Sequence, residues 1–133
     1  MIRALLAMLL LGATQASAQT PPPVPAPAAP PPPAETWLAR PNADLAALDK
    51  ITARVSPLTG HVGQPMHFGT LSVTVRSCIV RGPDQPADQA AFIDVTDSRD
   101  ASFSFHGWML LSAPGVSVLE HPVYDIRLTG CRA

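Results

Sequence analysis

The stretch Phe68–Cys78, which reads Phe-Gly-Thr-Leu-Ser-Val-Thr-Val-Arg-Ser-Cys, decides the fold predicted from this sequence. From Leu71 onward apolar and polar side chains alternate and many are β-branched, a pattern typical of a half-buried β-strand. A second alternating run, residues 123–128, leads to Cys131, and the chain has only these two cysteines. We therefore expect two strands that are joined by a disulfide between Cys78 and Cys131.

Further short runs of β type occupy residues 50–56, 90–96 and 102–111, and residues 61–69 are interpreted as a strand broken by glycine and proline. The first of these runs has Ile51, Ala53 and Val55 on one face, and residues 57–60 follow as a turn. Residues 42–49 are interpreted either as one or two helical turns or as an irregular lead-in. No amphipathic helix pattern separates the strands. The sequence thus predicts an all-β fold, a small antiparallel β-sandwich or barrel of five to seven short strands clamped by one disulfide.

Two segments precede this domain. Residues 1–18 have a basic start, a leucine-rich apolar run and the small-x-small pattern Ala16-Ser-Ala18, so they are predicted to be a signal peptide that is cleaved before Gln19. A core helix at the N-terminus is the alternative. The apolar run is shorter than the roughly 20 residues that a membrane helix needs, so we expect no membrane span in the mature protein.

Residues 19–42 are rich in proline and alanine and are predicted to form a disordered linker, with the β domain at residues 43–133. Proline removes amide donors and fixes φ, so such a segment favours extended polyproline II and would act as a spacer of roughly 60 Å. It would serve as a tether or as a ligand for a proline-binding groove. The alternative is a leader without any partner.

Composition limits the compartment and the partners. The net charge is −1 and only 14% of the residues are charged, so no basic surface is available for nucleic acid. The two cysteines do not form a C-x-x-C motif, and in an exported chain they are expected to be oxidised. The predicted location is the periplasm, and the predicted partner is an envelope protein or polymer of unknown identity.

The strand period predicts where the bridge lies. Counting in steps of two places Cys78 on the face of Arg76 and Cys131 on the face of Arg127, which are the polar faces of their strands. We therefore expect the disulfide at a rim or on the outer face, unless a bulge near Gly130 turns Cys131 over. Asp125 is the expected partner of both arginines, although exposed charge pairs contribute at most about 1 kcal/mol.

Residues 120–125 hold the densest collection of functional groups. In a hydrolase, His121 would act as the base and Asp125 would orient it. The alternative is a structural turn in which Glu120 and His121 cap the connector and Tyr124 fills the core. Since no Gly-x-Ser-x-Gly elbow is present, we assign no catalytic residue.

Trp108 is a separate candidate. It lies on the face opposite Phe105 and Met109, where an exposed tryptophan would be a binding anchor. In a closed two-layer fold it would instead cover a second core.

Histidine and methionine side chains, which suit copper in an oxidising compartment, raise the question of a metal site. They are His61, Met66, His67, His106, Met109 and His121. No ligand spacing is repeated among them, and Met109 shares the core-facing parity of Phe103 and Phe105. We therefore assign neither a metal nor a cofactor.

Several short strings resemble an uncharacterised bacterial family catalogued as domain of unknown function 2155. They are Val62-Gly63, Phe68-Gly-Thr-Leu71, Val75-x-x-Cys78, Ala90-Ala-Phe92, Phe105-x-Gly-Trp-Met109 and Glu120-His-Pro-Val-Tyr-Asp125 with Cys131. The resemblance covers residues 50–132 and implies an exported protein of the Gram-negative envelope, with no established activity, cofactor or catalytic residue. The turn at residues 98–102 is shorter than in the family pattern.

Taken together, the sequence favours an exported periplasmic or envelope-associated β domain that acts as a non-enzymatic binding or scaffolding module. The arginines Arg76 and Arg127 belong with Trp108 and residues 120–125 among its candidate binding residues. An envelope hydrolase that uses His121 and Asp125, or a copper-binding periplasmic protein, is the alternative.

Overall fold

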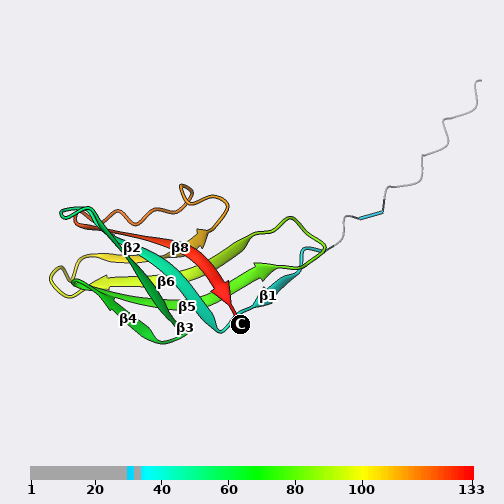
Figure 1. The fold of residues 1–133 in the computed structure, drawn as a ribbon, viewed down its shortest axis with the longest axis horizontal. Coiled ribbons are helices and arrows are strands. Elements are labelled where there is room, and N and C mark those ends of the chain that lie inside the picture. The colour runs from blue at the N-terminus through cyan, green and yellow to red at the C-terminus, as the bar shows by residue number, and fades with distance from the viewer. Residues whose placement is uncertain (1–29, 32–33) are drawn as a thin grey trace, which may run out of the picture. The chain divides into compact units, whose positions relative to one another are not determined.

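The computed structural model describes residues 30–31 and 34–133, so the expected signal peptide and most of the expected linker lie outside the described residues. In the described part the chain forms eight strands and no helix (Figure 1). They are β1 (Trp37–Ala39), β2 (Asn42–Asp49), β3 (Arg54–His61), β4 (Pro65–Phe68), β5 (Leu71–Arg81), β6 (Gln89–Asp97), β7 (Ser104–Leu110) and β8 (Tyr124–Arg132). Thus these residues offer no helix with the length and apolar character that crossing a bilayer requires.

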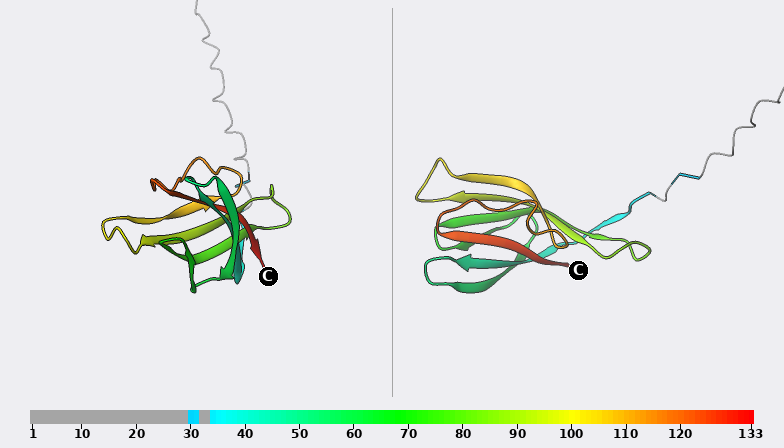
Figure 2. Two further views of the ribbon diagram at one scale, coloured as in Figure 1. Left: turned by 60° about the vertical axis from the view of Figure 1, so that its left-hand side comes forward. Right: turned by 90° about the horizontal axis from the view of Figure 1, so that it is seen from above.

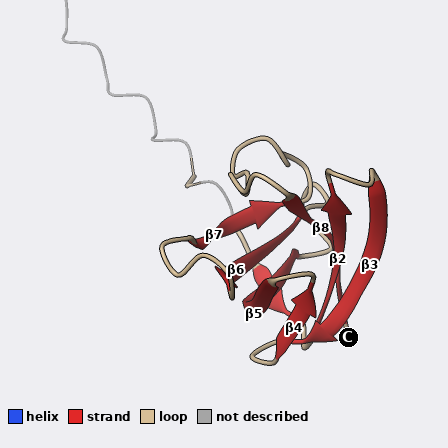
Figure 3. Ribbon diagram, turned by 90° about the vertical axis from the view of Figure 1, so that its left-hand side faces the viewer, coloured by secondary structure: helices blue, strands red, loops and turns tan. Residues whose placement is uncertain are grey.

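The strands form two antiparallel sheets. In the larger sheet β1 and β4 both pair with β5, and β6 and β7 follow; the smaller sheet has the order β3-β2-β8. The sheets lie on two sides of a common core, and the long connector after β7 passes between β7 and β8 (Figure 3). The predicted all-β antiparallel fold is confirmed. The described residues contain one strand more than the five to seven expected, because the two N-terminal strands were not predicted.

The first correction concerns residues 42–49, which form strand β2 and not a helical turn or an irregular lead-in. Its alternate residues Ala43, Leu45 and Ala47 are fully buried between the sheets. Alanine and leucine favour helices, but β2 is the central strand of its sheet and pairs on both sides. Tertiary pairing therefore overrides local propensity.

The second correction concerns the neighbouring strand, which begins at Arg54 and not at Lys50. Residues 50–53 form the β2–β3 turn, where the Asp49 carboxylate accepts the amides of Ile51 and Thr52. Ala53 has a positive φ of 53°. The predicted turn at residues 57–60 is part of β3, an edge strand where the proline's missing amide can face solvent. Because it lies in the β2–β3 turn, and not in a strand as predicted, Ile51 is 76% exposed.

The predicted Cys78–Cys131 disulfide is present, but it lies in the core and not at a rim or on the outer face. Cys78 is 1% exposed and Cys131 is 7% exposed. The β5–β6 register shifts between Val75 and Ser77, and the β2–β8 register shifts at Asp44/Leu45. Each bulge inserts one residue, Arg76 in β5 and Thr129 in β8, and turns the following cysteine inward. The second is the bulge near Gly130 that was the stated exception for Cys131, whereas the bulge in β5 was not expected. The bridge therefore joins the two sheets through the core.

Strand β1 lies within the range for which a linker was expected. Its three residues pair with Ile79–Arg81 of β5, at the opposite end of that strand from β4. Within the described residues the β structure thus begins at Trp37. Figure 2 shows β1 beside the β5–β6 hairpin at one end of the domain, and the β2–β3 and β6–β7 turns at the other end.

Candidate functional site

The end of the domain that carries the β6–β7 turn holds the buried side chain of His121, which is 5% exposed. The imidazole stacks on Tyr124, with 5.3 Å between the ring centroids, and meets the edge of Phe103 at 4.7 Å. Its Nε2 lies 2.9 Å from Oδ2 of Asp97, at the end of β6. Leu119, also fully buried, holds the connector beside this cluster.

The hydrogen bonds of His121 determine its tautomer. The amides of Val123 and Tyr124 donate to Nδ1 at 3.2 and 3.1 Å, so Nδ1 carries no proton. Nε2–H therefore donates to Asp97. The amide of Arg99 and the hydroxyl of Thr70, together with His121, lower the pKa of Asp97 from 3.8 to about 2. Both ring nitrogens are occupied, which is the arrangement of a structural histidine.

The expected pairing of His121 with Asp125 is therefore replaced by one with Asp97. Asp125 forms an ion pair with Arg127, at 2.9 Å between Oδ2 and Nε, as expected. Its other oxygen is buried and has no hydrogen-bond partner among the described residues. Tyr124 packs edge-on against Phe68 and against the core, as the structural interpretation predicted, whereas Glu120 is exposed.

Trp108 lies on the outer face of the larger sheet and is 42% exposed. Its indole packs edge-to-face on Phe92 of the neighbouring strand, with 5.5 Å between the ring centroids. Phe92 fixes the ring and leaves much of the indole open to solvent.

Beside this aromatic pair, Arg76 pairs with Asp94, at 2.5 Å, and not with Asp125. The Asp94 carboxylate also contacts His106 at 2.9 Å. These two contacts, His106 first, lower the pKa of Asp94 below its ordinary value. One side of the aromatic pair is thus polar and charged.

On the other side of the aromatic pair, the outer face of the larger sheet continues toward β1. Strand pairing shows which residues lie on it, because cross-strand partners share a face. We call this surface the outer stripe. Its successive levels are Trp37–Arg81, Ala39–Ile79–Ala90–Leu110, and Ser77–Phe92–Trp108. The stripe therefore runs from a charged end, through aliphatic side chains, to the aromatic pair.

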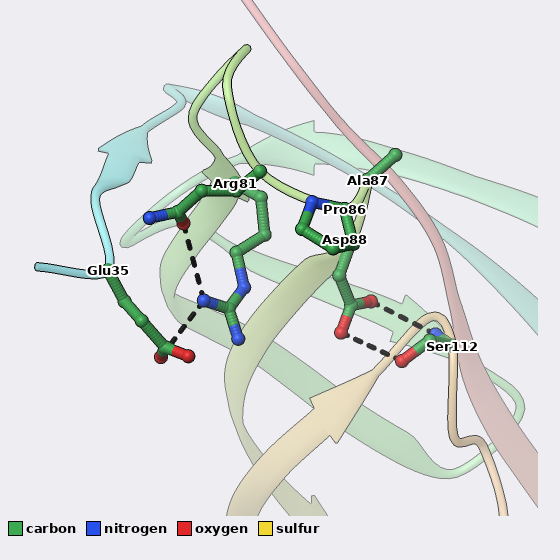
Figure 4. Close-up of a pocket in the computed structure, with 7 residues that line it drawn as sticks. Glu35, Arg81, Pro86, Ala87, Asp88 and Ser112 are labelled. Carbon is green, nitrogen blue, oxygen red and sulfur yellow. Dashed lines mark hydrogen bonds and ion pairs between the residues drawn. The ribbon is translucent and has the colours of Figure 1, made fainter. Parts of the chain in front are cut away.

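At the charged end the stripe opens into a cleft of about 350 Å³ between the lead-in to β1, the β5–β6 loop and the end of β7 (Figure 4). The Arg81 guanidinium lies over the Trp37 ring at 4.3 Å. Its Nη1 donates to Oε1 of Gln85 at 3.3 Å and forms an ion pair with Glu35 at 2.9 Å. We call this cleft the Arg81 cleft.

The opposite wall of the Arg81 cleft is Asp88. Its carboxylate accepts the hydroxyl of Ser112 at 2.7 Å and the amides of Ser112 and Gln89 at 3.1 and 2.8 Å. Burial alone would raise the pKa of Asp88, but these hydrogen bonds hold it below its ordinary value. Asp88 is thus an ionised and well-satisfied part of the wall.

The histidines among the candidate metal ligands form no metal-binding cluster with other His, Cys, Asp or Glu side chains in the described part of the chain. Among residues 30–31 and 34–133, no group of three or more His, Cys, Asp or Glu side chains is arranged to hold a metal ion. The His121 imidazole contacts the Asp97 carboxylate, and the His106 imidazole contacts the Asp94 carboxylate. Met109 is buried in the core, as predicted from its position on the same side of the strand as Phe103 and Phe105.

The Arg81 cleft was missed from sequence. It depends on β1 and on contacts that residues 34–36 make with Arg81 and with the β5–β6 loop, more than 40 positions later. The local signal was a tryptophan inside a proline-rich segment, which offers an apolar side chain where packing was not expected.

A family model described as "Uncharacterized protein conserved in bacteria (DUF2155)" matches residues 43–131. "Uncharacterized protein RP359" of Rickettsia prowazekii (strain Madrid E) is 29% identical over 93 residues, which make up 68% of this chain and 60% of that protein. The chain thus spans about 60% of the length of this curated relative. No solved structure shows a significant match.

Proposed function

We propose that this chain, which belongs to the bacterial family DUF2155, works as an exported, non-enzymatic binding module of the cell envelope. Its partner surface is the outer stripe, with Trp108 as the anchor. The observation that carries the proposal is the half-exposed Trp108 held edge-on by Phe92. Tryptophan is enriched among residues that dominate binding energies, and a ring that is already fixed loses little freedom on binding.

The disulfide supports export. Disulfides persist in oxidising compartments such as the periplasm and are rare in the cytosol. Cys78 and Cys131 are joined in the core, so the fold itself uses the bridge. The proposed route is a signal peptide at residues 1–18, followed by a proline-rich spacer that holds the domain away from its point of attachment.

We propose that His121 is not a catalytic base, and the reason is its hydrogen bonding. A general base needs a free ring nitrogen within reach of a substrate proton. The backbone amides and Asp97 use both nitrogens, and the ring is buried. Turnover of peptidoglycan fragments or simple esters that is lost in His121→Gln would contradict this part of the proposal.

Export is tested by cell fractionation and by the mass of the mature chain. The expected result is a periplasmic protein that begins at Gln19 and carries no free thiol. An intact N-terminus together with two free thiols would refute the exported state.

Binding is tested by capture from envelope extract with the wild-type chain, Trp108→Ala and the control Ile51→Ala. Ile51 is also an exposed large apolar residue, but it lies in the β2–β3 turn. We expect capture to be lost only in Trp108→Ala. Equal capture by all three would exclude the outer stripe as the partner surface. A fourth chain lacking residues 20–33 separates a partner of the spacer from a partner of the domain and leaves β1 intact.

A further inference from the structure

We infer that the Arg81 cleft is a binding site for a free carboxylate, and that Glu35 occupies it in place of the ligand. The ligand is the C-terminus of an extended peptide that lies along the outer stripe. This inference rests on the proposed function, because it names the partner class of the same surface. Three neighbouring features carry the inference. The Arg81 guanidinium is fixed by its own contacts, the Glu35 carboxylate that pairs with it is exposed, and the apolar side chains of the outer stripe begin next to it.

Arg81 is held in place by contacts that do not involve Glu35. Its guanidinium lies on the Trp37 ring and donates to Gln85. Its amide donates to the carbonyl of Asp88 at 2.9 Å, which fixes the backbone at the end of β5. An arginine that is already ordered loses little freedom when it binds an anion, and its planar fork suits carboxylates.

The lead-in to β1 is fixed around Glu35, but the carboxylate itself is not. Gln85 Nε2 donates to the carbonyl of Ala34, and Gly82 donates to that of Thr36, so both neighbours are tied to the β5–β6 loop. The Glu35 side chain is 68% exposed and reaches Arg81 through a single nitrogen atom. An exposed pair of this kind contributes little free energy, so another carboxylate can replace Glu35 at small cost.

The remaining walls restrict the ligand. Asp88 is ionised and its oxygens are occupied by Ser112 and the Gln89 amide, so it disfavours a second negative charge close to Arg81. A dianion such as phosphate is therefore a poorer ligand than a single carboxylate. Pro86 and Ala87 supply an apolar wall, and about 350 Å³ is at the lower limit of ligand pockets. The cleft fits a terminal residue and not a large ligand.

The outer stripe gives the rest of the peptide a path. Ile79 and Leu110 lie one level beyond Arg81, and Phe92 and Trp108 lie one level further. In an extended peptide alternate side chains point the same way, at about 6.6 Å per two residues. A peptide with its carboxylate on Arg81 therefore places alternate apolar side chains over these two levels.

The test uses the pentapeptide acetyl-Leu-Ser-Leu-Ser-Ala as a free acid, the same peptide as a C-terminal amide, and acetate alone. Intrinsic fluorescence reports binding, because both tryptophans, Trp37 and Trp108, belong to the outer stripe. We expect the full-length wild-type protein to bind the free acid at least tenfold more tightly than the amide. Equal affinities would overturn the carboxylate site, and acetate binding as tight as the peptide would overturn the peptide assignment.

Three variants separate the contributions. Arg81→Gln should remove the preference for the acid, with folding verified by circular dichroism. Glu35→Gln, at an exposed position, should strengthen binding of the acid about two- to fivefold, since it removes the competing carboxylate. Arg99→Gln, at an exposed arginine in the β6–β7 turn at the other end of the domain, should leave both affinities unchanged. No binding of the free acid by wild type and Glu35→Gln at millimolar concentration would refute the inference.

The envelope capture distinguishes this inference from the proposed function. If Trp108→Ala loses its partner while Arg81→Gln retains it, the carboxylate site is wrong and the binding module stands. If neither substitution changes capture, both are wrong.

Discussion

Reduction of the Cys78–Cys131 disulfide is expected to lower the free energy of unfolding by about 4 kcal/mol. The bridge closes a loop with a sequence separation of 53 residues. The chain-entropy relation gives about 14 cal/mol/K for such a loop, which is about 4 kcal/mol at 25 °C. The compact unit from Pro33 to Ala133 has about 100 residues and an expected total stability of about 5–15 kcal/mol. The bridge thus accounts for a large share of it.

The burial of the bridge also predicts its kinetics. Because both sulfurs belong to cysteines in the core, a reductant reaches them only when the sheets separate. Reduction under native conditions should therefore be slow, and its rate should rise with low concentrations of urea. A bridge at the rim, as counting by two along the strands predicted, would be reduced rapidly without denaturant.

The assay is equilibrium unfolding in urea, followed by tryptophan fluorescence, of the oxidised protein and of protein refolded in reductant. The same chain in two redox states contains the same side chains, so no cavity is introduced. In thermal unfolding of the same two samples, the melting temperature of the reduced protein should be lower by about 15–30 °C. The double variant Cys78→Ala/Cys131→Ala is the control, since reductant should not affect it. An unchanged midpoint for the reduced wild type would refute the reasoning.

Three further predictions concern single side chains. Gly69→Ala should destabilise the domain by about 2 kcal/mol or more in urea unfolding, because Gly69 has a φ of +57° and an added Cβ would collide with the Tyr124 hydroxyl. Asp97 contributes stability above its unfolded pKa, and this is lost as the pH falls towards its folded pKa of about 2; the melting temperature of Asp97→Asn should vary less than that of wild type between pH 5 and 2. Ile51→Thr should change stability by less than about 0.5 kcal/mol, whereas Leu45→Ala, in the core, should cost about 2–5 kcal/mol; equal losses would contradict the observed β2–β3 turn.

The fold class was predictable because alternation and turn residues are local signals. The strand at Leu71–Arg81 and the inward positions Ala91, Ile93 and Val95 follow directly from the period of two. Strand β2 was not predictable in this way. Its short, helix-favouring residues become a strand only because β3 and β8 pair with it on both sides. Local propensity cannot reveal a partner that lies about 80 positions away.

The candidate sites show where counting by two fails. A single extra residue near Arg76 moves every later position in β5 to the opposite face of the sheet. Counting by two from Arg76 therefore placed Cys78 outward, although the alternation of faces itself holds on either side of the bulge. The same inversion puts Ile79 and Arg81 on the face of Phe92 and Trp108 and so creates the outer stripe. The bulge that buries the disulfide therefore also aligns the proposed binding surface with Arg81. Deleting Arg76 should consequently expose Cys78 and turn Arg81 away from Trp37 together, a coupled change that a surface independent of the bulge would not show.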